Sequence, residues 1–116
     1  GDAISLSAAK LNLREVADAI VKILGIEAVD FRVEYRPLTR ENLIPSAKIQ
    51  VAAKRPITPE EKKAILDVIF ENNSPVNYEV NVAKRAKLEI DQIPVQELIQ
   101  KLYPRPGKPK RLEIIS

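Results

Sequence analysis

The chain has 116 residues, a net charge of +3 and no histidine, cysteine, methionine or tryptophan. It therefore lacks the side chains that most often act as proton carriers at neutral pH, as thiolate nucleophiles and as soft metal ligands. Hydrophobic residues make up 45% and charged residues 30%, which is typical of one folded domain and not of a disordered chain. We expect a protein that binds or positions something, not an enzyme, with no cofactor and no metal.

Charge is distributed unevenly along the chain. Residues 1–83 carry 11 Lys and Arg against 12 Asp and Glu, whereas residues 84–116 carry 8 against 4. No apolar stretch approaches the roughly 18 residues that cross a bilayer. The longest candidate, Ala19–Ile26, is short and contains Lys22.

The first elements are a short strand and a helix. Ala3–Ser7 alternates apolar and polar residues, which predicts a strand. From Leu11 onward the spacing of the apolar residues changes. Apolar residues then follow the three-and-four spacing of a helix with one buried face, at Leu13, Val16, Ala17, Ile20, Ile23 and Leu24. Gly25 ends this helix, because glycine accepts the left-handed conformation that closes a helix C-terminus.

Two strongly alternating segments follow. Val29, Phe31, Val33 and Tyr35 alternate with charged residues, and after a loop over residues 37–46 the apolar members of residues 47–54 alternate with Lys and Gln. Each pattern predicts a strand with one buried and one solvated face. We expect the two strands to pair antiparallel as a long hairpin, with Asp30, Arg32, Glu34, Lys48 and Gln50 on the solvated face.

A second helix and a further strand complete the predicted core. Thr58-Pro59-Glu60-Glu61 combines an N-cap hydroxyl, a proline at the first helical position and a carboxylate that can bond back to the cap. The helix that starts there is expected to stop at Asn72–Pro75. Val76, Tyr78, Val80 and Val82 then alternate with polar residues, which predicts a strand with Tyr78 in the core.

These elements predict an α+β fold of ferredoxin-like, split βαβ type. The order is βαββαβ if the N-terminal strand joins the sheet, and αββαβ if it does not; in both, two helices cover one face of an antiparallel sheet. We assign residues 1–83 to this core and residues 84–116 to a basic C-terminal extension. The extension is predicted to contain a strand at 87–90, a helix at 93–103, a proline-rich segment and a short strand at 111–115. The two strands are expected to pair as a small βαβ-like appendage.

Several segments resemble known modules. Residues 12–83, with Ile44–Val51 opening the middle strand, resemble the ring-building motif of secretion and flagellar basal-body proteins and the BON-like lipid-associated domain. Residues 55–60 are similar to the soluble C-terminal region of an uncharacterised family of hydrophobic multi-spanning membrane proteins. The extension after Ala83 departs from the ring-building pattern. The resemblance implies a domain that is attached to a membrane protein and associates with copies of itself.

The residues offer little for catalysis. A serine or threonine nucleophile would need a lysine or carboxylate as its base, and Thr58 is already assigned as a helix cap. Glu60 and Glu61 suit a helix N-terminus without any metal. The loop cluster Arg36, Arg40 and Asn42 is a candidate anion site, because forked donors bind anions, although solvated charge is the alternative reading of these three residues.

A second candidate site is the basic C-terminal segment. Its cations Arg105, Lys108, Lys110 and Arg111 lie among prolines and suit phosphate or nucleic acid. Sequence-specific reading of nucleic-acid bases is disfavoured, because the predicted solvated sheet face carries no aromatic ring for stacking.

We therefore expect a non-enzymatic assembly or partner-binding module, acting through an open sheet edge or the mixed-charge face. Its partner would be a protein or a second copy of the chain, with phosphate or nucleic acid as the alternative ligand. Any membrane contact would come from a part of the protein outside this sequence.

Overall fold

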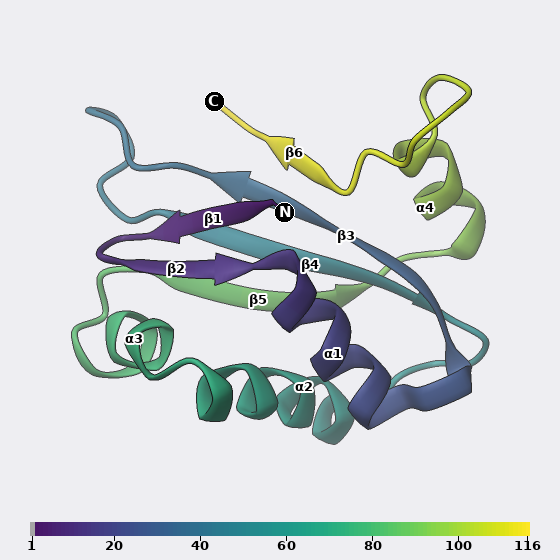
Figure 1. Cartoon of the computed structure of the whole chain (residues 1–116), viewed down its shortest axis with the longest axis horizontal. Coiled ribbons are helices and arrows are strands. Elements are labelled where there is room, and N and C mark those ends of the chain that lie inside the picture. Colours follow the sequence, from purple (N-terminus) through teal and green to yellow (C-terminus); the bar gives the residue numbers. More distant parts are fainter. Residues whose placement is uncertain (1) are drawn as a thin grey trace.

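A mixed sheet of four strands forms the centre of the structure, a computed structural model that describes residues 2–116 (Figure 1). The strands are β3 (Ala28–Arg36), β4 (Ser46–Ala53), β5 (Lys87–Gln92) and β6 (Leu112–Ile114), and their order is β5-β4-β3-β6. β3 and β4 pair antiparallel, as their alternation predicted. β5 runs parallel to β4, and β6 runs parallel to β3. The α+β class is confirmed, but the sheet is not purely antiparallel.

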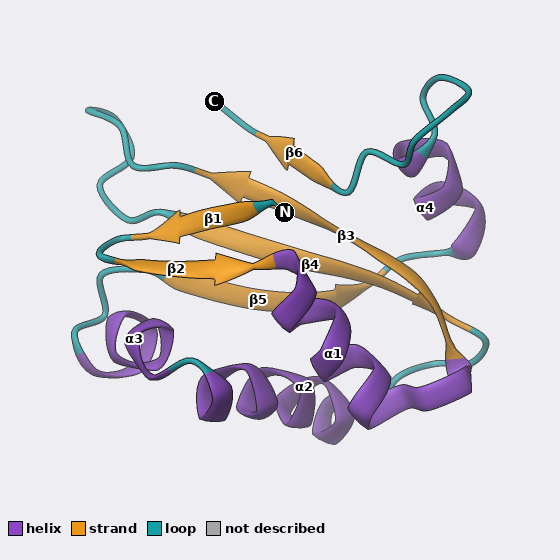
Figure 2. Ribbon diagram, in the orientation of Figure 1, coloured by secondary structure: helices purple, strands orange, loops and turns teal. Residues whose placement is uncertain are grey.

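Helices lie on both faces of this sheet (Figure 2). α1 (Leu13–Leu24) and α2 (Pro59–Asn72) pack together on the apolar face, over Val33, Ile49 and their neighbours. Both begin at capping boxes, which satisfy backbone N–H groups that have no partner inside the helix. α1 ends at Gly25, whose positive φ of 55° favours glycine, but its ψ of −131° differs from the left-handed helical conformation that was expected.

The predicted N-terminal strand exists, but it does not join the main sheet. β1 (Ala3–Leu6) pairs antiparallel with β2 (Ala9–Asn12) in a separate hairpin that turns at Ser7. Its alternate residues Ile4, Leu6, Ala9 and Leu11 are buried against the core. The βαββαβ order of the ferredoxin-like prediction is therefore wrong, because the fourth strand of the sheet comes from the end of the chain and not from its start.

The strand predicted from Val76 to Val82 is also wrong. The structure has helix α3 (Ser74–Asn77) followed by a π-helical turn (Tyr78–Val82). The side chain of Asn73 caps α3 by accepting a hydrogen bond from the Val76 N–H at 3.1 Å. Helical geometry breaks the alternation, so Tyr78 is 51% exposed and does not share the core with Phe31 and Tyr35.

The π-helical turn contains a buried glutamate, Glu79. Its carboxylate is buried and accepts hydrogen bonds from Arg85 at 3.0 and 2.7 Å. These bonds lower the pKa of Glu79, and the Ser7 hydroxyl and the Ala8 N–H lower it further. The π-helical turn therefore buries a carboxylate that pairs with Arg85, a feature that the alternating valines do not reveal.

The two C-terminal strands do not pair with each other, which corrects the predicted appendage. β5 and β6 form the opposite edges of the sheet. Pairing of apolar residues on neighbouring strands explains these positions. Leu88 and Ile90 of β5 lie opposite Ala47 and Ile49 of β4, and Leu112 of β6 lies opposite Val33 of β3. Residues 84–116 thus supply both outer strands, and α4 (Val95–Leu102) connects them.

α4 covers part of the sheet face that was predicted to be solvated. Leu98 and Leu102 of α4 are buried together with Ala52 and Ile93 in a second apolar cluster. Figure 1 shows α4 apart from α1 and α2, on the other side of the sheet. None of the helices within residues 2–116 combines the length and the apolar composition needed to cross a membrane.

Arg32 was predicted to be exposed on this face, but it is only 1% exposed. It donates a hydrogen bond to Oε1 of Gln50 at 2.7 Å and pairs with the carboxylates of Glu34 and Glu113. Hydrogen bonding to Arg32 lowers the pKa of Glu113. The guanidinium therefore joins three strands of the sheet through their side chains.

We expect stability to fall in acid, most visibly through Glu61. Two hydrogen bonds from Arg55, each 2.8 Å, hold the pKa of the Glu61 carboxyl at about 2 rather than 4.5, and the Thr58 N–H bond adds to the effect. A pKa that is lower in the folded state stabilises the fold above the unfolded value. This contribution is lost as the pH falls from 4.5 to about 2.

Urea unfolding midpoints measured between about pH 7 and pH 2.5 test this expectation. Glu61→Gln is the informative variant, because glutamine also serves in a capping box but does not titrate. It should have a lower midpoint near neutral pH and a shallower decline in acid. An equally steep decline in Glu61→Gln would show that the Arg55–Glu61 pair does not contribute.

Candidate protein-docking groove

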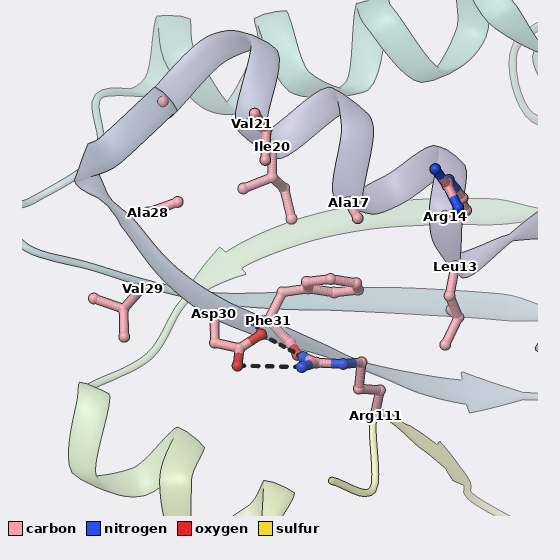
Figure 3. A pocket seen from close by; sticks show the side chains of 11 residues that line it. Leu13, Arg14, Ala17, Ile20, Val21, Ala28, Val29, Asp30, Phe31 and Arg111 are labelled. Carbon is pink, nitrogen blue, oxygen red and sulfur yellow. Dashed lines mark hydrogen bonds and ion pairs between the residues drawn. The ribbon is translucent and has the colours of Figure 1, made fainter.

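A groove of about 440 Å³ lies between α1 and the first half of β3 (Figure 3). Most of its lining is apolar, and the α1 residues face the β3 residues across it. These side chains are Leu13, Ala17, Ile20, Val21, Val29 and Phe31. Polar groups come from Arg14, Asp30 and Arg111. The groove is mainly a contact surface for apolar groups, with charge at its margin.

The short β6 strand leaves this groove open. β6 pairs only with Val33, Glu34 and Tyr35 of β3. The preceding chain turns away from the sheet, and Lys110 donates its N–H to the Leu102 carbonyl of α4 at 2.6 Å. Residues 28–32 of β3 therefore have no strand partner on the side opposite β4.

Two charged side chains occupy this free edge. Asp30 Oδ1 accepts a hydrogen bond from the Phe31 N–H at 2.9 Å, and Arg111 Nη1 donates to the Phe31 carbonyl at 3.0 Å. The guanidinium and the carboxylate also form an ion pair, drawn as dashed lines in Figure 3. The guanidinium carbon of Arg111 lies 5.3 Å from the centre of the Phe31 ring, a cation–π distance. Side chains of this kind protect an edge strand from unwanted pairing.

Exposed aliphatic side chains continue the groove onto the surface. Val21 is 63% exposed and Val29 is 42% exposed, and both line the groove. Ile26, one residue beyond the groove-lining Gly25, is 84% exposed. A cluster of exposed aliphatic residues around an apolar groove is typical of an interaction surface.

The predicted basic site is divided by the structure. Arg111 turns toward Asp30 and Phe31 and is half-buried. Arg105, Lys108 and Lys110 are exposed on the loop between α4 and β6, and within residues 2–116 they form no ion pair. The four cations are therefore not one patch.

The predicted loop site is also only partly assembled. The side-chain amide of Asn42 donates to the Pro37 carbonyl at 2.9 Å, and its backbone N–H donates to the Thr39 hydroxyl at 3.0 Å. Asn42 and Arg36 line a cavity of about 170 Å³ that Arg40 does not line. Asn42 therefore closes the loop through hydrogen bonds, while Arg36 and Arg40 are exposed.

No group of three or more acidic side chains within residues 2–116 is placed to hold a metal ion.

Comparisons of the sequence with protein-family models and with curated proteins find no match.

Proposed function

We propose that this chain is a partner-binding module that docks an apolar segment of another protein in the groove between α1 and β3. The observation that supports this most strongly is the combination of an apolar groove with exposed Val21, Val29 and Ile26 around it. Keeping three aliphatic side chains in water has a cost that a partner would remove.

The charges at the groove margin support the same proposal. Arg14 is exposed, and Asp30 is already neutralised by Arg111. Protein interfaces commonly have such an apolar centre with a polar rim. Docking a segment against Phe31 and Ile20 would leave these charges near the edge, where water still reaches them.

A peptide selection tests the proposal. A phage-displayed library of random dodecapeptides is selected on the immobilised chain, and the enriched peptides are synthesised and titrated by calorimetry. We expect Val21→Glu to weaken the best peptide by at least about tenfold, because it places a charge at the apolar contact. Ile99→Glu on α4 is the matched control, since Ile99 is also an exposed aliphatic residue (48%) on a helix.

Binding that both glutamate variants weaken equally would contradict the proposal, as would binding that neither affects. Thermal unfolding of both variants tests whether the fold is retained. Sedimentation of the chain alone tests whether it self-associates. If it does, and Val21→Glu prevents the self-association, the docked segment comes from a second copy of the chain. The predicted attachment to a membrane protein stays a prediction.

A further inference from the structure

We infer that the groove accepts an extended strand, which pairs with the free edge of β3 at the point where β6 stops. This inference rests on the proposed docking function and specifies the conformation of the partner segment. Its basis is the backbone hydrogen bonding of β3, read together with the contacts that Asp30 and Arg111 make with Phe31.

Alternate residues of β3 direct their backbone groups toward β6. Val33 donates its N–H to the Arg111 carbonyl at 2.7 Å, and the Tyr35 carbonyl accepts the Ile115 N–H at 2.8 Å. Because backbone direction alternates along a strand, Phe31 directs its N–H and C=O toward the same edge. A β6 strand that began earlier would bond to both groups of Phe31.

Side chains make those two bonds instead. The Asp30 carboxylate accepts from the Phe31 N–H, and the Arg111 guanidinium donates to the Phe31 carbonyl. An incoming strand can replace both with backbone groups of the same donor and acceptor character. The displaced side chains remain paired with each other, so the exchange leaves no isolated charge.

The groove beside this edge suits the side chains of a strand. Phe31, Ala17 and Ile20 lie where every second side chain of an added strand would point. The free edge over residues 28–32 accommodates about four residues, or about 13 Å of extended chain. A docked helix satisfies its own backbone groups and would gain nothing from the edge of β3. The hydrogen-bonding groups therefore favour strand addition over helix docking.

N-methylation of the docked peptide tests this inference. The highest-affinity dodecapeptide from the selection is remade with one backbone N–H methylated at a time. A strand at a sheet edge donates every second N–H, so we expect alternate positions to lose about tenfold or more in affinity. Sensitivity at consecutive positions, or at none, would overturn the inference while leaving a Val21-dependent docking function intact. Loss of the Val21 dependence would instead refute the docking function.

Arg111→Gln provides a second measurement on the chain itself. It weakens the competing contact on the Phe31 carbonyl, so we expect the same peptide to bind about fivefold more tightly. Asp30→Asn should act in the same direction, since it removes the charge that holds Arg111. Arg105→Gln is the control, because Arg105 is exposed and forms no ion pair within residues 2–116. Unchanged or weaker binding by both edge variants would overturn the inference.

Discussion

Replacing Arg32 with alanine is expected to lower the free energy of unfolding by about 3 kcal/mol. The guanidinium is 1% exposed, and it bonds to Gln50, Glu34 and Glu113. Removing the guanidinium leaves the buried Gln50 amide without its hydrogen-bond donor. It also leaves the partly buried carboxylates of Glu34 and Glu113 without their cation. The cost stays at the lower end for a buried pair, because the Glu113 side chain is 40% exposed and water can solvate it.

Urea unfolding of the wild type and two variants measures this effect. Besides Arg32→Ala, the double variant Arg32→Met with Glu113→Gln keeps the volume and removes one of the two uncompensated charges. It should recover about half of the lost stability, since a matched apolar replacement of a buried ion pair is often tolerated. If Arg32→Ala changes the free energy of unfolding by less than about 0.5 kcal/mol, the interaction across the three strands is not stabilising.

Leu98→Ala is expected to destabilise the protein by about 3 kcal/mol, as is usual for a buried leucine. Leu98 is fully buried and packs with Ala52 and Ile93 in the cluster that attaches α4 to the sheet. Since β5 and β6 form the two edges of that sheet, we expect one cooperative transition at a lower denaturant concentration. The neighbouring Ile99→Ala is the control and should change stability by less than about 0.5 kcal/mol, because Ile99 is 48% exposed.

Calorimetry together with circular dichroism follows the transition in both variants. Two separate transitions, only one of them shifted by Leu98→Ala, would show that the elements after Ala83 unfold independently. That outcome would contradict the shared sheet, because strands of one hydrogen-bonded sheet are expected to unfold together.

Local signals predicted much of the fold. The cap at Thr58, the glycine after Leu24 and the alternation around Val33 each involve neighbours in sequence. Such signals need no knowledge of distant contacts, so α1, α2, β3 and β4 could be placed from the sequence. The alternation of Val76–Val82 predicted a strand that does not form, because the cap at Asn73 starts a helical segment there.

The features that depend on long-range contacts could not be predicted. Arg32 alternates like a solvated residue, and the partners that accompany its burial, Gln50 of β4 and Glu113 of β6, are distant in sequence. Likewise, 81 residues separate Asp30 from Arg111, and no spacing rule connects them. Arg111 was predicted to belong to a basic segment that suits phosphate or nucleic acid, and not to pair with Asp30. Val21 falls outside the apolar residues that define the buried face of its helix, which was the only local sign of the groove. Val29 fits the alternation of its strand and was expected on the buried face, but the register is irregular between Ala28 and Asp30 and Val29 is 42% exposed.

The position of β6 also affects how the protein is made. Leu112–Ile114 are the last residues of the sheet to leave the ribosome, and until then β3 has no strand partner on its outer side. The nascent hairpin of β3 and β4 lacks β5 as well until residue 92 has emerged. Both flanks of an apolar two-stranded ribbon are then available to other chains. Asp30 lies on this ribbon from the beginning, so its charge can discourage aggregation before Arg111 has been synthesised.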